Sequence, residues 1–346
     1  MKRLLGLILA ATCALYTLAP AETSANPKHK QLPTTIAYSV EVIYEPGSFV
    51  DLNNHEELAG IRFDSEGNAF GVFIDKKERV VTFQCDSEFP RLLGAQPSAI
   101  NNHGDITGFC GDSAGFIRNR KGVITKFRSP CPDIILCQQF GEPQMLPNGI
   151  NDRGHVVGEL INPPASFNVS GFFRLHGFLF KHGQFTEISV PAPHPDDADI
   201  PNPLVRTVPQ DINNRGQILG YYETINSATN ESGPPRLFIY DNGQFDLLDI
   251  VPAIFASIGP RAFAINNDGQ ILLPLIVDGV FDFYIYDDGH FFRILDPEGF
   301  LWIVISGIND KGQLVGIVSE AGHTPEPPFI PPPSFRVIAT PVRHGK

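Results

Sequence analysis

The sequence predicts an all-β protein, a β-propeller of six four-stranded blades. Three observations support this class: a strand-rich composition, a short core that recurs six times, and an aromatic hairpin that follows each copy. The chain has 346 residues, of which 42% are hydrophobic and 18% are charged, with 27 Phe and only 2 Met. This balance favours strands over helices, and it is too apolar for a disordered chain.

The repeated core is nine residues long. Its copies read INNHGDITG, INDRGHVVG, INNRGQILG, INNDGQILL and INDKGQLVG, starting at residues 100, 150, 212, 265 and 308. A degenerate copy, LNNHEELAG, starts at residue 52. The starts are separated by 48, 50, 62, 53 and 43 residues, and a period of this length indicates a repeat architecture.

Each core is predicted to be a turn between two strands. The Asn can bond to the backbone just beyond it, and the Gly supplies a positive φ without steric strain. These structural turn residues are Asn101, Gly104, Asn151, Gly154, Asn213, Gly216, Asn266, Gly269, Asn309 and Gly312. A calcium role for them is disfavoured, because no copy has the D-x-[DN]-x-[DN]-G pattern of an EF-hand loop.

A second element follows each core. It is clearest in residues 177–186, 237–245 and 283–291, and looser in residues 115–127 and 70–83. Each predicts two aromatic-rich strands joined by a tight turn, with Asn-Gly or Asp-Gly in the best copies. Each unit therefore contains four antiparallel strands in about fifty residues, the size of a propeller blade.

The ends of the chain predict how the ring closes. The last unit contains a third strand near residues 334–340 but no fourth. Residues 36–44 can supply that strand, which would give six blades in a single domain over residues 36–341. Rings of five or seven blades and an open β-solenoid remain alternatives.

The core and the aromatic hairpin resemble the HAF-repeat proteins, a family of probable extracellular repeats in bacteria. The resemblance covers roughly residues 36 to 341. The His-Ala-Phe tripeptide of the family is not intact, and residues 176–178, 68–70 and 236–238 stand at the equivalent places. The resemblance implies an exported, propeller-like protein and carries over no catalytic residue.

The N-terminus predicts export. Lys2 and Arg3 precede an apolar stretch, and cleavage is expected after Ala21 or Ala25, so that residues 1–25 form a signal peptide. The apolar stretch is too short to span a bilayer. Four cysteines remain after cleavage, and two disulfides with three possible pairings are expected in an exported chain. These cysteines are Cys85, Cys110, Cys131 and Cys137.

The net charge of −12 makes nucleic acid an unfavourable partner. No downstream segment reaches the length of a membrane span. We expect a secreted or periplasmic monomer that binds a protein or a carbohydrate. The variable b–c and d–a connections should share one face of the ring, which is the usual place for binding on a rigid scaffold.

Two candidate chemical sites stand out. Gly111 to Gly115 match G-x-S-x-G around Ser113, but a nucleophile elbow needs a following helix, and a strand is expected here. The second site is a weak candidate for metal, such as a structural calcium, since carboxylates with a His can bind a cation. Its residues are His194, Asp196, Asp197 and Asp199. A solvated acidic loop is the commoner explanation, and no cofactor is expected.

Two functions follow from these observations. The first is a non-enzymatic exported binding or scaffold module. The alternative is a propeller hydrolase or lyase that acts on extracellular glycans. Such an enzyme should bring paired carboxylates to the channel. The sequence indicates no such pair beyond the acidic loop, which favours the first function and leaves catalytic residues unassigned.

Overall fold

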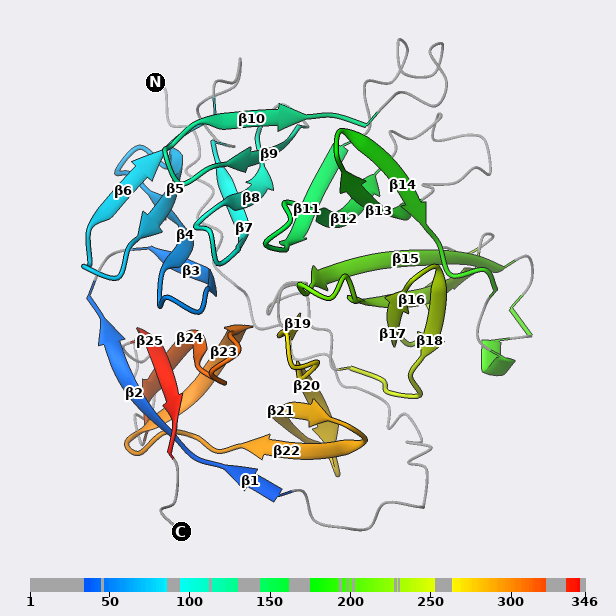
Figure 1. The fold of residues 1–346 in the computed structure, drawn as a ribbon. Helices are drawn as coiled ribbons and strands as arrows, with labels where there is room; N and C mark the ends of the chain where they lie inside the picture. Colours follow the sequence, from blue (N-terminus) through cyan, green and yellow to red (C-terminus); the bar gives the residue numbers. More distant parts are fainter. Residues whose placement is uncertain are drawn as a thin grey trace, which may run out of the picture.

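The computed structural model is a ring of six β-sheets around a central axis (Figure 1). It describes residues 34–44, 47–85, 94–111, 114–129, 144–161, 175–192, 195–197, 199–200, 203–226, 229, 231–252, 263–321 and 334–342. The six blades confirm the predicted fold class.

Blades 1 to 3 are antiparallel meanders that follow the chain from the axis outward. Blade 1 consists of β3 (Ser48–Leu52), β4 (Leu58–Phe63), β5 (Ala69–Ile74) and β6 (Val80–Phe83). Blade 2 consists of β7 (Gln96–Ile100), β8 (Ile106–Phe109), β9 (Gly115–Arg118) and β10 (Ile124–Phe127). Blade 3 consists of β11 (Gln144–Ile150), β12 (Val156–Ile161), β13 (Leu175–Lys181) and β14 (Gln184–Ile188).

Blades 4 and 5 repeat this order. Blade 4 consists of β15 (Pro203–Ile212), β16 (Ile218–Asn226), β17 (Arg236–Asp241) and β18 (Gln244–Leu247). Blade 5 consists of β19 (Ala264–Ile265), β20 (Ile271–Val277), β21 (Val280–Asp287) and β22 (His290–Ile294). A short 3-10 helix, η1 (Pro195–Asp197), precedes blade 4.

Blade 6 joins the two ends of the domain. It contains β23 (Phe300–Ile308), β24 (Leu314–Glu320) and β25 (Ser334–Pro341), and its outermost strand is the N-terminal β2 (Tyr38–Ile43). β2 pairs antiparallel with β25, from Tyr38 opposite Pro341 to Ile43 opposite Arg336. The predicted closure is confirmed. An additional strand, β1 (Thr34–Ile36), pairs parallel with β22 on the outside of blade 5.

The turns form as their residues predict. The core glycines have φ between 71° and 91°, and Glu56 takes the same left-handed conformation in the degenerate first copy, with φ 61°. The hairpins at His182-Gly183, Asn242-Gly243 and Asp288-Gly289 have positive φ at both residues, as in type I′ turns. Aromatic side chains then fill the space between blades, where Phe127 of blade 2 stacks on Phe180 of blade 3 with centroids 4.4 Å apart.

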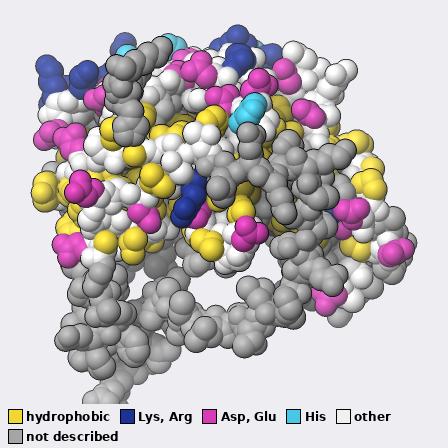
Figure 2. Space-filling model, turned by 90° about the horizontal axis from the view of Figure 1, so that it is seen from below, with side chains coloured by type: hydrophobic (Ala, Val, Ile, Leu, Met, Phe, Trp, Pro, Cys, Tyr) yellow, Lys and Arg dark blue, Asp and Glu magenta, His cyan; other side chains and the backbone are white. Residues whose placement is uncertain are grey.

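The meander gives the ring two different faces. The a–b turns that contain the repeated cores, together with the c–d turns, lie on one face, which we call the turn face. The b–c and d–a connections lie on the opposite face, which we call the loop face. In Figure 2, dark blue Lys and Arg side chains gather along the upper edge of the molecule, and most exposed Lys and Arg among the described residues belong to turn-face turns.

Candidate functional site

The axis of the ring is lined at the turn face by the six repeated cores. The first Asn of each core is buried, and its Nδ2 donates to the backbone carbonyl of the equivalent Asn in the next blade, at 3.0 to 3.3 Å. The six bonds run from Asn53 around the ring to Asn309 and back to Asn53. They form a closed circle of hydrogen bonds that connects every blade to the next.

A second circle lies beside the first. Its members are the mouth residues Asn54, Asn102, Asp152, Asn214, Asn267 and Asp310. The side-chain oxygen of each accepts a hydrogen bond from the backbone N–H of the equivalent residue in the preceding blade, at 2.6 to 2.9 Å. Asp152 also accepts from the side chains of Asn102 and Asn214, and Asp310 accepts from those of Asn54 and Asn267.

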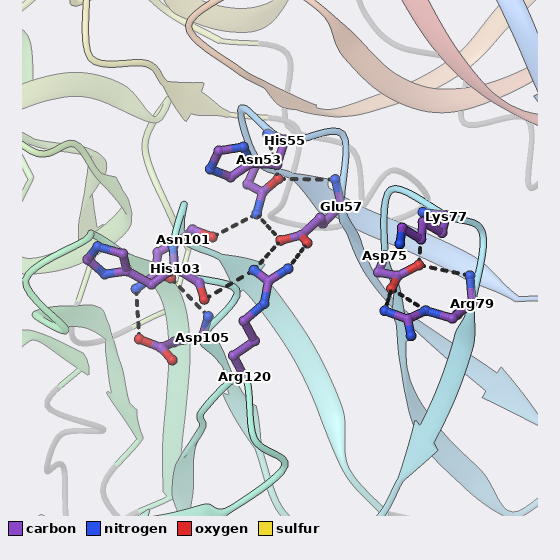
Figure 3. Close-up of polar contacts among 10 residues, drawn as sticks. All are labelled: Asn53, His55, Glu57, Asp75, Lys77, Arg79, Asn101, His103, Asp105 and Arg120. Atoms are coloured by element: carbon purple, nitrogen blue, oxygen red, sulfur yellow. Dashed lines mark hydrogen bonds and ion pairs between the residues drawn. The ribbon is translucent and has the colours of Figure 1, made fainter.

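The polar contacts between blades extend outward from these circles. Figure 3 shows Glu57 of blade 1, which accepts a hydrogen bond from Asn53 and pairs with Arg120 of blade 2 through both guanidinium nitrogens. The Glu57 side chain is 2% exposed, whereas the Arg120 side chain is 53% exposed. The turn face is therefore held together by hydrogen bonds and ion pairs between neighbouring blades.

Beneath the mouth, two carboxylates enter the axial cavity from opposite sides. The residues that precede each repeated core form the axial positions Asp51, Ala99, Gly149, Asp211, Ala264 and Gly307. This order is Asp-Ala-Gly twice, so Asp51 and Asp211 stand three blades apart in a ring of six. Both line the same cavity of about 60 Å³. Blades 1 to 3 and 4 to 6 thus repeat each other at the axis.

The glycines in this pattern make room for the carboxylates. A Cβ placed on Gly149 would lie 2.7 Å from Oδ1 of Asp211, and one placed on Gly307 would lie 2.7 Å from Oδ1 of Asp51. Each Asp also bonds two backbone N–H groups at 2.8 to 2.9 Å, one in its own blade and one in the next. The carboxylates are therefore held in fixed positions.

The surroundings of these two carboxylates disfavour negative charge. Burial raises the pKa of Asp211 to about 6, against the opposing effect of the N–H bonds from Ile265 and Ile212. Burial, and then the charge of Asp211, raise the pKa of Asp51 well above its ordinary value. No Lys, Arg or His among the described residues lines the cavity.

A second, smaller cavity of about 20 Å³ shares Asp51 and Asp211 with the first. It is lined by residues that bulge from the inner strands: Val50, Ser98, Asn148, Gln210 and Ser306. A β-bulge redirects a side chain out of the regular alternation of the strand. Gln210 is 4% exposed, and its Nε2 has no hydrogen-bond partner among the described residues. In the described part of the chain, the axis therefore holds two carboxylates and the unpartnered amide of Gln210.

Sequence reasoning missed this pair. The repeated core drew attention to Asn and Gly, and the preceding residue differs from copy to copy. A signal for the pair is nevertheless present in the sequence. The residue before each core and the second residue after its start both vary from copy to copy, and both series repeat every three copies. The predicted turn residues lie together at the turn face.

The acidic segment before blade 4 is engaged by protein groups. Asp197 is buried, accepts a hydrogen bond from Thr224 and pairs with Arg236 at 3.2 Å, and Asp196 pairs with the same Arg236 at 3.4 Å. Asp199 is exposed, and His194 lies outside the described residues. No group of three His, Cys, Asp or Glu suited to a metal occurs in the described parts of the chain. The metal role stays a prediction.

Among the predicted disulfide candidates, Cys85 and Cys110 are bonded, with their sulfur atoms 1.96 Å apart. The bond links the end of β6 in blade 1 to the end of β8 in blade 2, at the loop face. Cys131 and Cys137 lie outside the described residues, as do residues 1–25 and Ser113. Gly115 begins strand β9, so a strand follows the G-x-S-x-G segment.

The strand pairing defines this chain as a six-bladed β-propeller. No family model matches it, so the resemblance to HAF-repeat proteins is not confirmed. No curated protein matches it either. Within the part of the chain that the structure describes, no helix has the length and apolar character to cross a membrane.

Solved structures similar to this chain include a β-propeller domain, a gluconolactonase and a lectin. The β-propeller domain of the Trilobed protease from Pyrococcus furiosus has a TM-score of 0.46 at 15% identity, over 78% of this chain and 74% of that chain. A gluconolactonase from Xanthomonas campestris has a TM-score of 0.46 at 10% identity, over 90% of this chain and 96% of that chain. The Aleuria aurantia lectin has a TM-score of 0.43 at 11% identity, over 82% of this chain and 91% of that chain.

Proposed function

We propose that this chain is an exported, non-enzymatic propeller that binds a protein or carbohydrate ligand through its loop face. The observation that carries the proposal is the contrast between the two faces. The turn face consists of short, uniform turns joined by two hydrogen-bond circles. The connections assigned to the loop face range in length from residues 278–279, between β20 and β21, to residues 128–143, between β10 and β11. Unequal connections on a rigid scaffold are the usual place for binding.

The Cys85–Cys110 bond supports export, because disulfides persist in oxidising compartments. Together with the predicted signal sequence, it favours a secreted or periplasmic protein.

The test is a binding assay on a glycan array and on immobilised extracellular proteins. The protein is compared with a variant in which residues 162–174 are replaced by Asn-Gly, and with a control in which Lys76 and Lys77 of the turn face become Ala. We expect at least a tenfold loss of affinity in the loop variant and no change in the control. Loss in the control alone would contradict the proposal.

The alternative, a hydrolase or lyase that acts on extracellular glycans, is favoured by one observation. Asp51 and Asp211 oppose each other across a cavity, and their raised pKa values are of the kind that acid–base catalysts show. Each carboxylate is, however, bonded to two backbone N–H groups in a small cavity. Polysaccharide cleavage that Asp211→Asn abolishes, with the fold intact, would favour the enzyme.

A further inference from the structure

The carboxylates at the axis share two cavities that no cationic side chain among the described residues lines. Asp51 and Asp211 are both partly buried. A carboxylate that is partly removed from water is stabilised when a positive charge or a proton compensates it. The twofold pattern of the axial positions places both carboxylates on the same cavities.

The oxygen atoms that face the cavity can still accept interactions. Each of the four carboxylate oxygens accepts one backbone N–H, from Leu52, Ile100, Ile212 or Ile265. A carboxylate offers about four lone-pair sites, so about two sites on each side chain remain available. Fixed carboxylates with free lone pairs are suited to bind a cation between them.

The amide of Gln210 is an independent observation that points to a ligand. Buried side-chain amides are normally hydrogen-bonded, but Nε2 of Gln210 has no partner among the residues that the structure describes, although only 4% of Gln210 is exposed. The two ends of a Gln amide have nearly the same shape. A rotation of the amide by about 180° exchanges its nitrogen and oxygen, so Oε1 can take the position of Nε2. Gln210 lines the smaller cavity together with Asp51 and Asp211.

We propose that the axial cavity binds one hard divalent cation, Ca²⁺, between Asp51 and Asp211, with the side-chain oxygen of Gln210 as a third ligand. Ca²⁺ takes carboxylate, amide and water oxygens, and the lining contains oxygen ligands and no His or Cys. Two carboxylates balance the charge of one divalent ion. The second cavity, with about 20 Å³, has room for an ion, and water in the wider mouth completes the coordination.

This site differs from the acidic segment considered from the sequence. There, the buried Asp197 already pairs with Arg236, whereas no described Lys, Arg or His lines the axial cavities. The axial site also joins blades that are far apart in the chain, because its ligands come from blade 1 and blade 4. A bound ion would therefore connect the two halves of the ring.

The experiment measures Ca²⁺ itself on the EDTA-treated full chain by isothermal titration calorimetry, with the melting temperature as a second readout. We expect one ion per chain and a melting temperature that rises with Ca²⁺ concentration, because a ligand of the folded state stabilises it. The double variant Asp51→Asn with Asp211→Asn should lose at least tenfold in affinity. Asp268→Asn, an exposed change in the turn of blade 5, should not alter binding.

Two variants keep the proposal testable if the double variant does not fold. Gln210→Glu should strengthen Ca²⁺ binding about tenfold, because it adds a third carboxylate, and Gln210→Leu should weaken it severalfold. The proposal is wrong if the parent protein binds no Ca²⁺ at millimolar concentration, or if binding is unchanged in the axial variants. Binding abolished by Asp196→Asn with Asp199→Asn, but kept in the axial variants, would place the ion in the acidic segment instead.

Discussion

At the scale of single residues, the repeated Asn combines the turn and the contact between blades in one side chain. In Asn213, Oδ1 accepts from the backbone N–H groups of Arg215 and Gln217, which shapes the turn. Its Nδ2 donates to the carbonyl of Asn266 in the next blade and to Oε1 of Gln217. An ordinary Asx turn needs only the two bonds that Oδ1 accepts. The additional bonds that Nδ2 donates require an amide, which explains why Asn is present in all six copies.

Asn213→Ala should therefore destabilise the protein by about 3 kcal/mol, since several buried hydrogen bonds are lost together. The measurement is urea denaturation. Asn119→Ala is the matched control, because Oδ1 of Asn119 accepts from the backbone N–H of Val123 within its own exposed turn, with no described contact to another blade. It should cost about 1 kcal/mol or less. Equal losses in the two variants would mean that the circle of bonds adds no stability.

His155 is the exception among the residues that close the core turns. The residues at this position in blades 4, 5 and 6 are Gln217, Gln270 and Gln313, and each accepts a hydrogen bond from the Asn of its own core. Nε2 of the buried His155 has no hydrogen-bond partner in the described part of the chain. His155→Gln should restore the missing bond and stabilise the protein by about 1 kcal/mol at pH 8.

The same substitution should reduce the dependence of stability on pH. Burial lowers the pKa of His155, as do the positive charges of Lys181, His182 and Arg153. The unfolded chain therefore binds a proton more readily, so protonation destabilises the folded state as the pH falls below about 6.5. Denaturation should show that the free energy of unfolding falls more between pH 8 and pH 5.5 in the parent than in His155→Gln. An equal fall in both proteins would mean that His155 does not cause the pH dependence.

At the scale of elements, the strands and turns were predictable because their signals are local. The Asn and Gly of each core, and pairs such as Asn242-Gly243, specify turns through neighbouring residues alone. The bulges at Asn148 and Gln210 were not predicted, because a bulge depends on the register against the next strand. β1 was also missed, since its parallel partner β22 lies more than two hundred residues away.

The contact between blades 1 and 2 allows a test of how elements are joined. Arg120→Ala would leave the buried carboxylate of Glu57 without its cation, and we expect a loss of about 3 kcal/mol. Glu57→Gln places in blade 1 the residue that blades 4 to 6 have at this position. In the Arg120→Ala background it should recover most of the loss, because a neutral amide can bond Asn53 without a cation.

Thermal and urea denaturation of the two single variants and the double variant give the interaction energy of the pair. If Glu57→Gln brings no recovery in the Arg120→Ala background, then the loss comes from packing of the Arg side chain rather than from the unpaired charge.

At the scale of the whole molecule, the axial site shows where prediction from one sequence stops. Asp51 and Asp211 line the same cavity from opposite blades because three blades of a six-bladed ring span half a turn, so this arrangement depends on the blade number. The acidic segment looked more suitable for metal because its carboxylates are adjacent in the chain, but Arg236 from β17 binds two of them. In both cases the decisive partner is distant in sequence.

Closure of the ring by β2 is the last property that can be tested at this scale. β2 covers the edge of β25 over six residue pairs, and Tyr38 is buried in the cluster between blades 5 and 6. A chain that lacks residues 1–44 would expose this edge and open blade 6. We expect its melting temperature to fall by about 10 °C, from the loss of roughly 5 kcal/mol of pairing and burial, together with aggregation through the open strand.

A chain that lacks only residues 1–33 is the control, because it keeps β1 and β2 and should melt like the parent. A synthetic peptide of residues 36–44, added to the chain that lacks residues 1–44, should raise the melting temperature of that chain in a concentration-dependent way. The reason is that the peptide binds the folded ring and not the unfolded chain. If the chain that lacks residues 1–44 were as stable as the parent, the hydrogen-bond circles at the axis would be sufficient to hold the ring together. In that case β2 would only cover the edge of β25.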